Sequence, residues 1–193
     1  MPQNSVHLCV DMQRMFLEAT DWQLPSMPDT LPAIEALVDA DPARTVFTRF
    51  IPPPAEATHG AWVDYYAAWP RMAREAIAPE LLGLAPSLAH YTPPARVFDK
   101  PVFSPWWSGE LHRLLQQAGI DTVIVSGGET DVCVLATIMG AIDLGYRVWL
   151  PTDAVCSSAE SCHEAMLSVF ESRFGVQVTT CTTDDILAKK LGA

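Results

Sequence analysis

The sequence predicts a three-layer α/β/α fold built on a six-stranded, mostly parallel sheet. Short apolar segments of strand length alternate with segments of helical periodicity along most of the chain. Strands that alternate with helices form parallel sheets that carry helices on both faces. Hydrophobic residues make up 49% of the 193 residues and charged residues 18%, a composition typical of a compact domain and not of a disordered chain. We therefore expect residues 1–193 to form a single domain.

The first half of the chain holds three of the predicted strands. Residues 5–10 (SVHLCV) are an apolar run with the length of a buried strand. Residues 30–40 predict a helix, because Leu31, Ile34, Leu37 and Val38 share one face. Residues 44–50 and 95–100 predict the second and third strands.

The second half of the chain continues the alternation. Residues 109–119 predict a helix that ends at Gly119. Strands are then predicted at 121–127, 146–151 and 176–180, and helices at 132–145, 159–175 and 183–191.

Residues 51–94 interrupt this pattern, because they are rich in proline and aromatic residues. Trp62, Tyr65, Tyr66 and Trp69 follow roughly helical spacing. The simpler interpretation is a short helix that packs on the core or on another subunit. The alternative is a lid whose aromatic rings form the wall of a small pocket, since a connection this long inside a compact domain is usually functional.

Charge and cysteine content narrow the classes of function. The chain has 12 Lys and Arg against 23 Asp and Glu, a net charge of -11, which disfavours binding to nucleic acids or to anionic membranes. Its five cysteines are odd in number and include no C-x-x-C pair, so neither a disulfide framework nor a zinc ribbon is indicated. No apolar run is long enough to cross a bilayer. We expect a cytoplasmic protein.

Three predicted strand ends carry complementary reactive groups. Asp11 follows the first strand, Lys100 ends the third, and Cys133 follows the fourth at the start of a helix. A helix N-terminus and a nearby ammonium lower the pKa of a thiol, and a carboxylate can carry its proton. Taken singly, Asp11 can cap a loop, Lys100 can be solvated and Cys133 can be a core residue. Because the carboxyl ends of parallel strands meet at one edge, the combination favours a catalytic site.

The segments "VDMQRMF", "FDKPVFSPW" and "GGETDVCVLATIMGAIDLGYRVWLPTDAV" resemble those of the isochorismatase-like cysteine hydrolases, a superfamily that includes nicotinamidases, N-carbamoylsarcosine amidohydrolase and biuret hydrolase-type enzymes. The resemblance implies that family's Rossmann-like fold and a catalytic triad of Asp11, Lys100 and Cys133. It also implies a cis peptide bond between Gly128 and Glu129, and an oxyanion hole formed by the backbone amides of Glu129 and Cys133. The implied reaction is hydrolysis of a C–N bond in a small amide, carbamoyl or ureido substrate through a cysteine thioester, without a cofactor.

The chain also departs from relatives in that superfamily. Nicotinamidases carry an Asp-x-His metal site after the second strand, where this chain has Thr48, Arg49 and Phe50. His59 stands alone, so we expect no metal. Isochorismatases that cleave a vinyl ether need no thiol, so the presence of Cys133 disfavours membership of that branch. Glu129 replaces a small residue, and its side chain either restricts the pocket or faces solvent.

Four residues are candidates for binding the substrate: Arg49, Phe50, Trp106 and Gln13. Arg49 pairs either with a substrate carboxylate or with an acidic residue of the protein, and Trp106 forms either a pocket wall or part of the core. We expect a homodimer or homotetramer, as is common in the family. The rival hypotheses are a non-catalytic binding or scaffold protein, a hydrolase of a non-amide substrate, and a thiol redox protein that uses Cys133 with Cys156.

Overall fold

The computed structural model describes residues 4–191, with side chains described through Ala188. Its strands form one sheet, in which every paired strand is parallel to its neighbour. The strands are β1 (Ser5–Val10), β2 (Thr45–Phe50), β3 (Arg96–Lys100), β4 (Thr122–Gly128), β5 (Arg147–Pro151), β6 (Val155–Cys156) and β7 (Val178–Cys181).

The strand order is β3-β2-β1-β4-β5-β7, with β6 beside β4. From the central pair, the chain builds the sheet outward through β2 and β3 in one direction, and through β5 and β7 in the other. The order therefore reverses between β1 and β4, which pair over six residues from Ser5 with Thr122 to Val10 with Gly127. Ligands of open α/β sheets bind outside the carboxyl ends of the strands at such a switch point.

The six predicted strands are confirmed, but the sheet has a seventh strand that the sequence analysis missed. β6 is only two residues long and pairs Val155 and Cys156 with Gly127 and Gly128. It follows a 3₁₀ turn at Thr152–Ala154, which returns the chain to β4 beyond the point where β5 leaves it. Two residues are too few to give a periodic signal.

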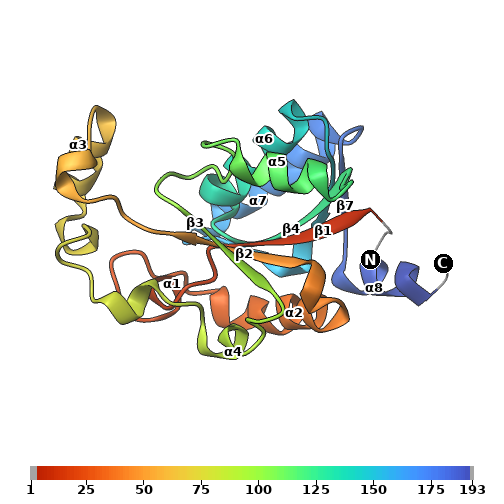
Figure 1. Ribbon diagram of the computed structural model, residues 1–193. Coiled ribbons are helices and arrows are strands. Elements are labelled where there is room, and N and C mark those ends of the chain that lie inside the picture. Colours follow the sequence, from red (N-terminus) through yellow and green to blue (C-terminus); the bar gives the residue numbers. More distant parts are fainter. Residues whose placement is uncertain (1–3, 192–193) are drawn as a thin grey trace.

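Helices cover both faces of the sheet, as Figure 1 shows. Four of them lie on one face: α1 (Arg14–Leu17), α2 (Met27–Ala40), α4 (Pro86–Ala89) and α8 (Thr183–Leu191). The other face carries α5 (Glu110–Gln117), α6 (Leu135–Asp143) and α7 (Glu160–Phe174). None of the described helices combines the length and apolar composition that a membrane crossing requires.

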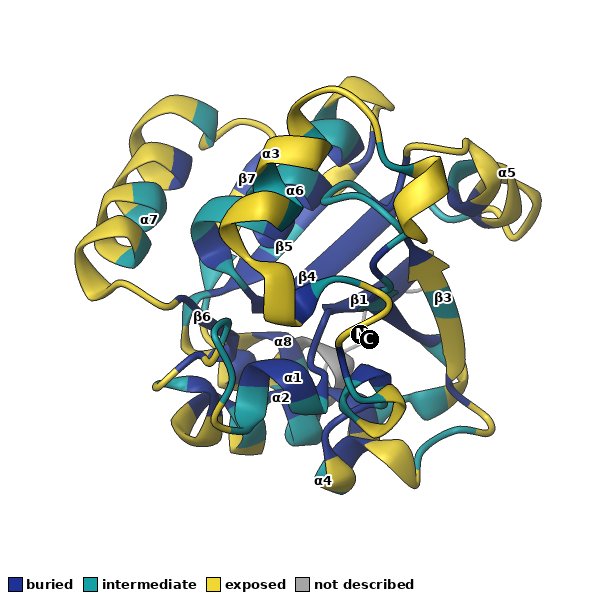
Figure 2. Ribbon diagram, turned by 90° about the vertical axis from the view of Figure 1, so that its left-hand side faces the viewer, coloured by how far each residue is buried: buried dark blue, intermediate teal, exposed yellow. Residues whose placement is uncertain are grey.

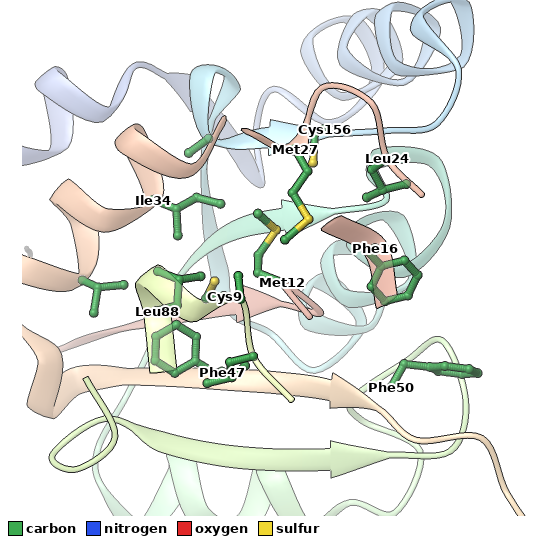
Figure 3. Close-up of a cluster of buried hydrophobic side chains, with 14 of the residues drawn as sticks. Cys9, Met12, Phe16, Leu24, Met27, Ile34, Phe47, Phe50, Leu88 and Cys156 are labelled. Carbon is green, nitrogen blue, oxygen red and sulfur yellow. The ribbon is translucent and has the colours of Figure 1, made fainter. Parts of the chain in front are cut away.

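A hydrophobic core fills the space on each side of the sheet, because neighbouring residues of a strand point to opposite faces. In β1, Cys9 belongs to the cluster that packs under α2, whereas Leu8 and Val10 belong to the cluster under α5 and α6. Figure 2 shows the central strands as the buried layer between more exposed helices. Figure 3 shows the first cluster, in which the Phe47 and Leu88 side chains lie near one another.

The proline-rich connection between β2 and β3 contains α3 (Ala61–Ala68), which has no fully buried residue. Figure 1 shows that α3 projects from the sheet on the side where β1 leads into α1. The part of the connection around α3 thus extends over the carboxyl ends of the strands, whereas α4, later in the same connection, packs on one face of the sheet with Leu88 in the core.

Candidate active site

Asp11 is held in place directly after β1 by contacts with β2. Its backbone adopts a positive φ of 52°, a conformation that aspartate tolerates better than most residues. The Asp11 amide donates to the Thr48 carbonyl at 3.2 Å, and the Thr48 hydroxyl donates to Asp11 Oδ1 at 2.6 Å. These bonds leave Oδ2 pointing to a second partner.

That partner is Lys100, the last residue of β3. Its side chain is fully buried, and its Nζ donates to Asp11 Oδ2 at 2.5 Å and to the Val102 carbonyl at 3.3 Å. The ammonium also lies 5.4 Å from the centre of the Phe50 ring, at the end of β2. A buried ion pair of this kind is held by its hydrogen bonds, and removing one partner leaves an uncompensated charge.

Cys133 lies in a π-helical turn, Thr130–Val134, that joins β4 to α6. The peptide bond between Gly128 and Glu129, just before this turn, is cis. Side chains fix the turn at both ends: the Thr130 hydroxyl donates to the Cys156 carbonyl at 3.0 Å, and the Thr137 hydroxyl donates to the Cys133 carbonyl at 2.7 Å. Asp11 and Lys100 both lie near enough to the Cys133 thiol to shift its pKa. The three strand ends therefore meet.

The thiol pKa differs from the sequence expectation. Burial raises the pKa of Cys133 above its ordinary value, the Lys100 ammonium lowers it in part, and the Asp11 carboxylate raises it. The expected depression by a helix N-terminus is therefore outweighed, because the sequence does not reveal how deeply the thiol is enclosed. Burial alone lowers the pKa of Lys100, but Asp11 and Cys133 raise it above its ordinary value, so the lysine stays charged. Burial and the Asp11 carboxylate thus favour the neutral thiol, and the Lys100 ammonium favours the thiolate.

Two neighbouring cavities lie on the side of the thiol that faces the aromatic segment. An inner cavity of about 30 Å³ is lined by Cys133 and Phe50. An outer cleft of about 740 Å³ opens beside it. The two share Trp22, Tyr65, Phe103, Glu129 and Val132 as wall residues.

The side chain of Glu129 belongs to this wall, and it does not simply face solvent. It lines both cavities and accepts a hydrogen bond from the Ser158 amide at 3.3 Å. Burial raises the pKa of Glu129, and the nearby Asp131 adds to that effect, whereas the bond from Ser158 lowers it. Of the two orientations left open by the sequence, the structure has the one that restricts the pocket.

Of the four candidate substrate-binding residues, the structure places only Phe50 at the cavity beside the thiol. Arg49 makes a two-point ion pair with Asp99 of β3, with nitrogen–oxygen distances of 2.7 and 2.8 Å. Arg49 lines neither the inner cavity nor the outer cleft. Of the two partners that the sequence left open for Arg49, the structure shows an acidic residue of the protein.

Trp106 and Gln13 are also placed differently from the expectation. The Trp106 indole donates to the Thr137 carbonyl at 2.8 Å and stacks on Tyr146, so it is a core residue behind α6. Gln13 is fully buried and bridges backbone groups: it accepts from the Phe50 amide at 2.6 Å and donates to the Phe50 and Leu82 carbonyls. Gln13 therefore positions the end of β2 and does not face the cavity.

The sequence analysis missed the role of Thr48 and most of the wall residues, among them Trp22 and Phe103. Trp22 and Phe103 come from separate loops, and their rings lie 5.7 and 6.0 Å from Tyr65 of α3. Thr48, considered only as a missing metal ligand, orients Asp11. The only feature of the sequence that indicated a role for Thr48 in the site is its position near the carboxyl end of the second strand. For the aromatic segment, the wall contributed by Tyr65 agrees with the lid interpretation.

The rival redox pair finds little support in the positions of the cysteines. Cys156 packs with Met27 and Leu24 in the core cluster under α2, as Figure 3 shows, whereas Cys133 belongs to the cluster on the other face. Burial raises the pKa of Cys156 to about 12. Within residues 4–188, no group of three or more His, Cys, Asp or Glu side chains is arranged to hold a metal ion.

Parts of the chain are similar to curated proteins. It is 31% identical over 83 residues to the maleamate amidohydrolase of Pseudomonas putida, which covers 43% of this chain and 39% of that protein. It is 34% identical over 76 residues to nicotinamidase 3 of Arabidopsis thaliana, which covers 39% and 38%. The matched stretches thus span less than half the length of these curated relatives.

Solved structures share the fold. A cysteine hydrolase from Pseudomonas syringae pv. phaseolicola has a TM-score of 0.82 at 22% identity, over 96% of this chain and 91% of that chain. N-carbamoylsarcosine amidase from Thermoplasma acidophilum has a TM-score of 0.76 at 19% identity, over 94% and 98%. The family model of the isochorismatase domain matches residues 5–182, which is most of the sequence. The chain belongs to the isochorismatase family.

Proposed function

We propose that this protein is a cysteine hydrolase that cleaves a C–N bond in a small amide, carbamoyl or ureido compound through a thioester on Cys133. The observation that carries the proposal is a buried Lys100–Asp11 ion pair against a thiol at the bottom of a cavity. A nucleophile beside a proton carrier, with a third group that orients the carrier, is the arrangement that covalent catalysis requires. The family relatives named as amidohydrolase, nicotinamidase and amidase support the same class of reaction.

In the first half of the reaction, Cys133 Sγ attacks the carbonyl carbon while its proton passes to the Asp11 carboxylate. A buried neutral thiol fits this sequence, because it is deprotonated only as it attacks. The Lys100 ammonium stays protonated and stabilises the negative charge near sulfur. The backbone N–H groups of Glu129 and Cys133 are the proposed donors to the tetrahedral oxyanion.

In the second half, the C–N bond breaks and the protonated Asp11 gives its proton to the departing nitrogen. This step releases ammonia or an amine and leaves an acyl thioester on Cys133. The Asp11 carboxylate then takes a proton from a water that attacks the thioester. Collapse of that intermediate releases the acid, and the proton returns from Asp11 to the thiolate.

The size of the inner cavity supports a compact reacting group. Its volume is about 30 Å³, so we place only the reacting carbonyl group there, beside Cys133. Any larger part of the substrate lies in the outer cleft.

The test is a panel of small primary amides, carbamoyl compounds and ureides, assayed for release of ammonia. We expect turnover of at least one class, and Cys133→Ala should lower it by at least about a thousandfold, as loss of a nucleophile does in other hydrolases. Cys156→Ala is the matched control and should retain activity, because that thiol lies in the opposite core cluster. A trapped acyl group on Cys133, seen by mass spectrometry, would identify the intermediate.

Two other outcomes would contradict the proposal. Release of ammonia that survives in Cys133→Ala would rule out the thioester route. No turnover of any panel member by folded protein would favour the non-catalytic binding hypothesis or a hydrolase of a non-amide substrate.

A further inference from the structure

The outer cleft is lined by acidic and aromatic side chains and lacks a basic one. Its carboxylates are Asp21, Glu129 and Asp131, and none of the described residues in its lining is Lys, Arg or His. A substrate carboxylate entering this cleft therefore meets charges of its own sign. The cleft is the wrong environment for an anionic amide.

The three carboxylates are not equally available. Asp21 forms an ion pair with Arg71, whose side chain is 81% exposed. Glu129 accepts from the Ser158 amide, and Asp131 accepts from the Ser157 hydroxyl. Among the described side chains, neither Glu129 nor Asp131 takes part in an ion pair. Two carboxyl groups without an ion-pair partner thus line the cleft, and one of them, Glu129, also lines the inner cavity beside the thiol.

Aromatic rings complete the walls between these carboxylates. Trp22, Tyr65, Trp69 and Phe103 all line the cleft. Tyr65 lies at the centre of the group, with its ring 5.7 Å from Trp22 and 6.0 Å from Phe103. The faces of aromatic rings attract ammonium and guanidinium groups, most strongly where water is excluded. Rings and carboxylates therefore favour the same kind of ligand.

We propose that the outer cleft selects amides or ureides that carry a positively charged group, with the Glu129 carboxylate as the main determinant of that preference. The inference rests on the proposed function, because it places the carboxamide in the inner cavity beside Cys133. The positive group then lies a short linker away, between Glu129 and the ring of Tyr65. The net charge of -11 acts in the same direction, since it attracts cations to the molecule.

Electrostatics at Glu129 agree with this assignment. Burial and the charge of Asp131 both raise the pKa of Glu129, so the empty cleft disfavours its ionised form. A bound cation offsets that repulsion, because an opposite charge within about 4–6 Å stabilises a carboxylate.

Three primary amides of matched length test the charge preference: 4-aminobutanamide, pentanamide and succinamate, which end in an ammonium, a methyl and a carboxylate group. We expect kcat/KM to be highest for 4-aminobutanamide, by about tenfold or more over pentanamide, as is typical of a partly desolvated charge pair. Succinamate should be the poorest substrate. The preference should shrink as salt is added, because exposed parts of the cleft are screened.

Variants then assign the preference to residues. Glu129→Gln should reduce the ratio of kcat/KM for 4-aminobutanamide over pentanamide to about twofold or less, mainly by raising KM for the cation. Glu171→Gln removes the same charge from an exposed position on α7 and should leave the ratio unchanged. Tyr65→Phe keeps the ring and should keep the ratio, whereas Tyr65→Leu should lower it.

The outcomes separate this inference from the proposed function. If none of the three amides, nor any member of the wider panel, releases ammonia, the proposed hydrolase function fails. If ammonia is released but pentanamide or succinamate is preferred by the wild-type protein, the function stands and the inference is overturned. A cation preference that persists in Glu129→Gln would overturn the assignment to Glu129.

Discussion

Lys100 influences both other members of the predicted triad, because its ammonium pairs with Asp11 and lowers the pKa of Cys133. Burial raises the pKa of the thiol, and the ammonium is the group that lowers it. Lys100→Met keeps the length and much of the volume of the side chain but removes the charge. We expect the pH at which Cys133 reacts with iodoacetamide to rise by about 1–3 units, the effect of a neighbouring charge on a pKa. Peptide mapping by mass spectrometry measures the rate for each cysteine.

Two controls accompany that measurement. Cys162 is exposed, so its rate in the same sample reports on the reagent and not on the site. Lys100→Met also leaves Asp11 buried without its partner, which costs about 3–5 kcal/mol of stability. The double variant Asp11→Asn/Lys100→Met avoids this and should show a raised reaction pH in a folded protein. An unchanged profile in both variants would show that Lys100 does not act on the thiol.

The second core cluster depends on how closely α6 approaches Trp106. A Cβ atom added at Gly140 would lie 2.3 Å from Trp106 Cδ1, a distance that the ring must move to avoid. In an ordinary helix, Gly→Ala stabilises by roughly 0.5–1 kcal/mol. Here we expect Gly140→Ala to lower the free energy of unfolding by about 1–3 kcal/mol, as overpacked cores do.

Urea unfolding monitored by circular dichroism measures this change. A decrease in the free energy of unfolding shows that Trp106 packs against Gly140, and an increase shows that it does not. The double variant Gly140→Ala/Trp106→Leu removes the clashing ring, so the alanine should cost less there than in the wild-type background. If Gly140→Ala stabilises the protein, Trp106 is not packed against α6. That result would reopen its expected role in the pocket wall.

Acid stability of the whole molecule depends on His7, which is buried in the middle of the sheet. Its Nε2 lies 2.7 Å from Ser126 Oγ, and burial lowers the pKa of His7 from 6.5 to about 3. Above pH 6.5 both the folded and unfolded imidazoles are neutral. As the pH falls from 6.5 to 3, only the unfolded chain takes up the proton. The free energy of unfolding therefore decreases by up to about 1.4 kcal/mol for each unit by which the pH falls.

The matched variants are His7→Gln, which removes the buried imidazole, and His59→Gln, which removes an exposed one. Urea unfolding at several pH values between 4 and 7 should give a shallower acid slope in His7→Gln, by about one bound proton. His59→Gln should keep the wild-type slope. Equal slopes in all three proteins would mean that His7 is already protonated in the folded state.

Oligomeric state also belongs to the scale of the whole molecule. The expected homodimer or homotetramer stays a prediction, which sedimentation equilibrium measures directly. The small-molecule substrate and the absence of a cofactor likewise stay predictions until the amide panel and a chelator control are run.

The sequence by itself determined the α/β alternation, the six main strands and the convergence of Asp11, Lys100 and Cys133. These follow from local patterns, because apolar runs set the strands and all parallel strands end at one edge. The resemblance over three separate segments indicated the family. The two-residue strand β6 escaped because it has no local signal.

Only the tertiary structure decided how these residues are surrounded. Whether Trp106 and Gln13 face the cavity depends on packing between distant segments, and so does the partner of Arg49. The enclosure of Cys133 reversed the expected direction of its pKa shift, since burial is a property of the assembled fold. The cleft walls come from Trp22, Tyr65, Phe103 and Glu129, four residues from separate parts of the chain. Side chains that meet only through the fold leave no pattern along the sequence.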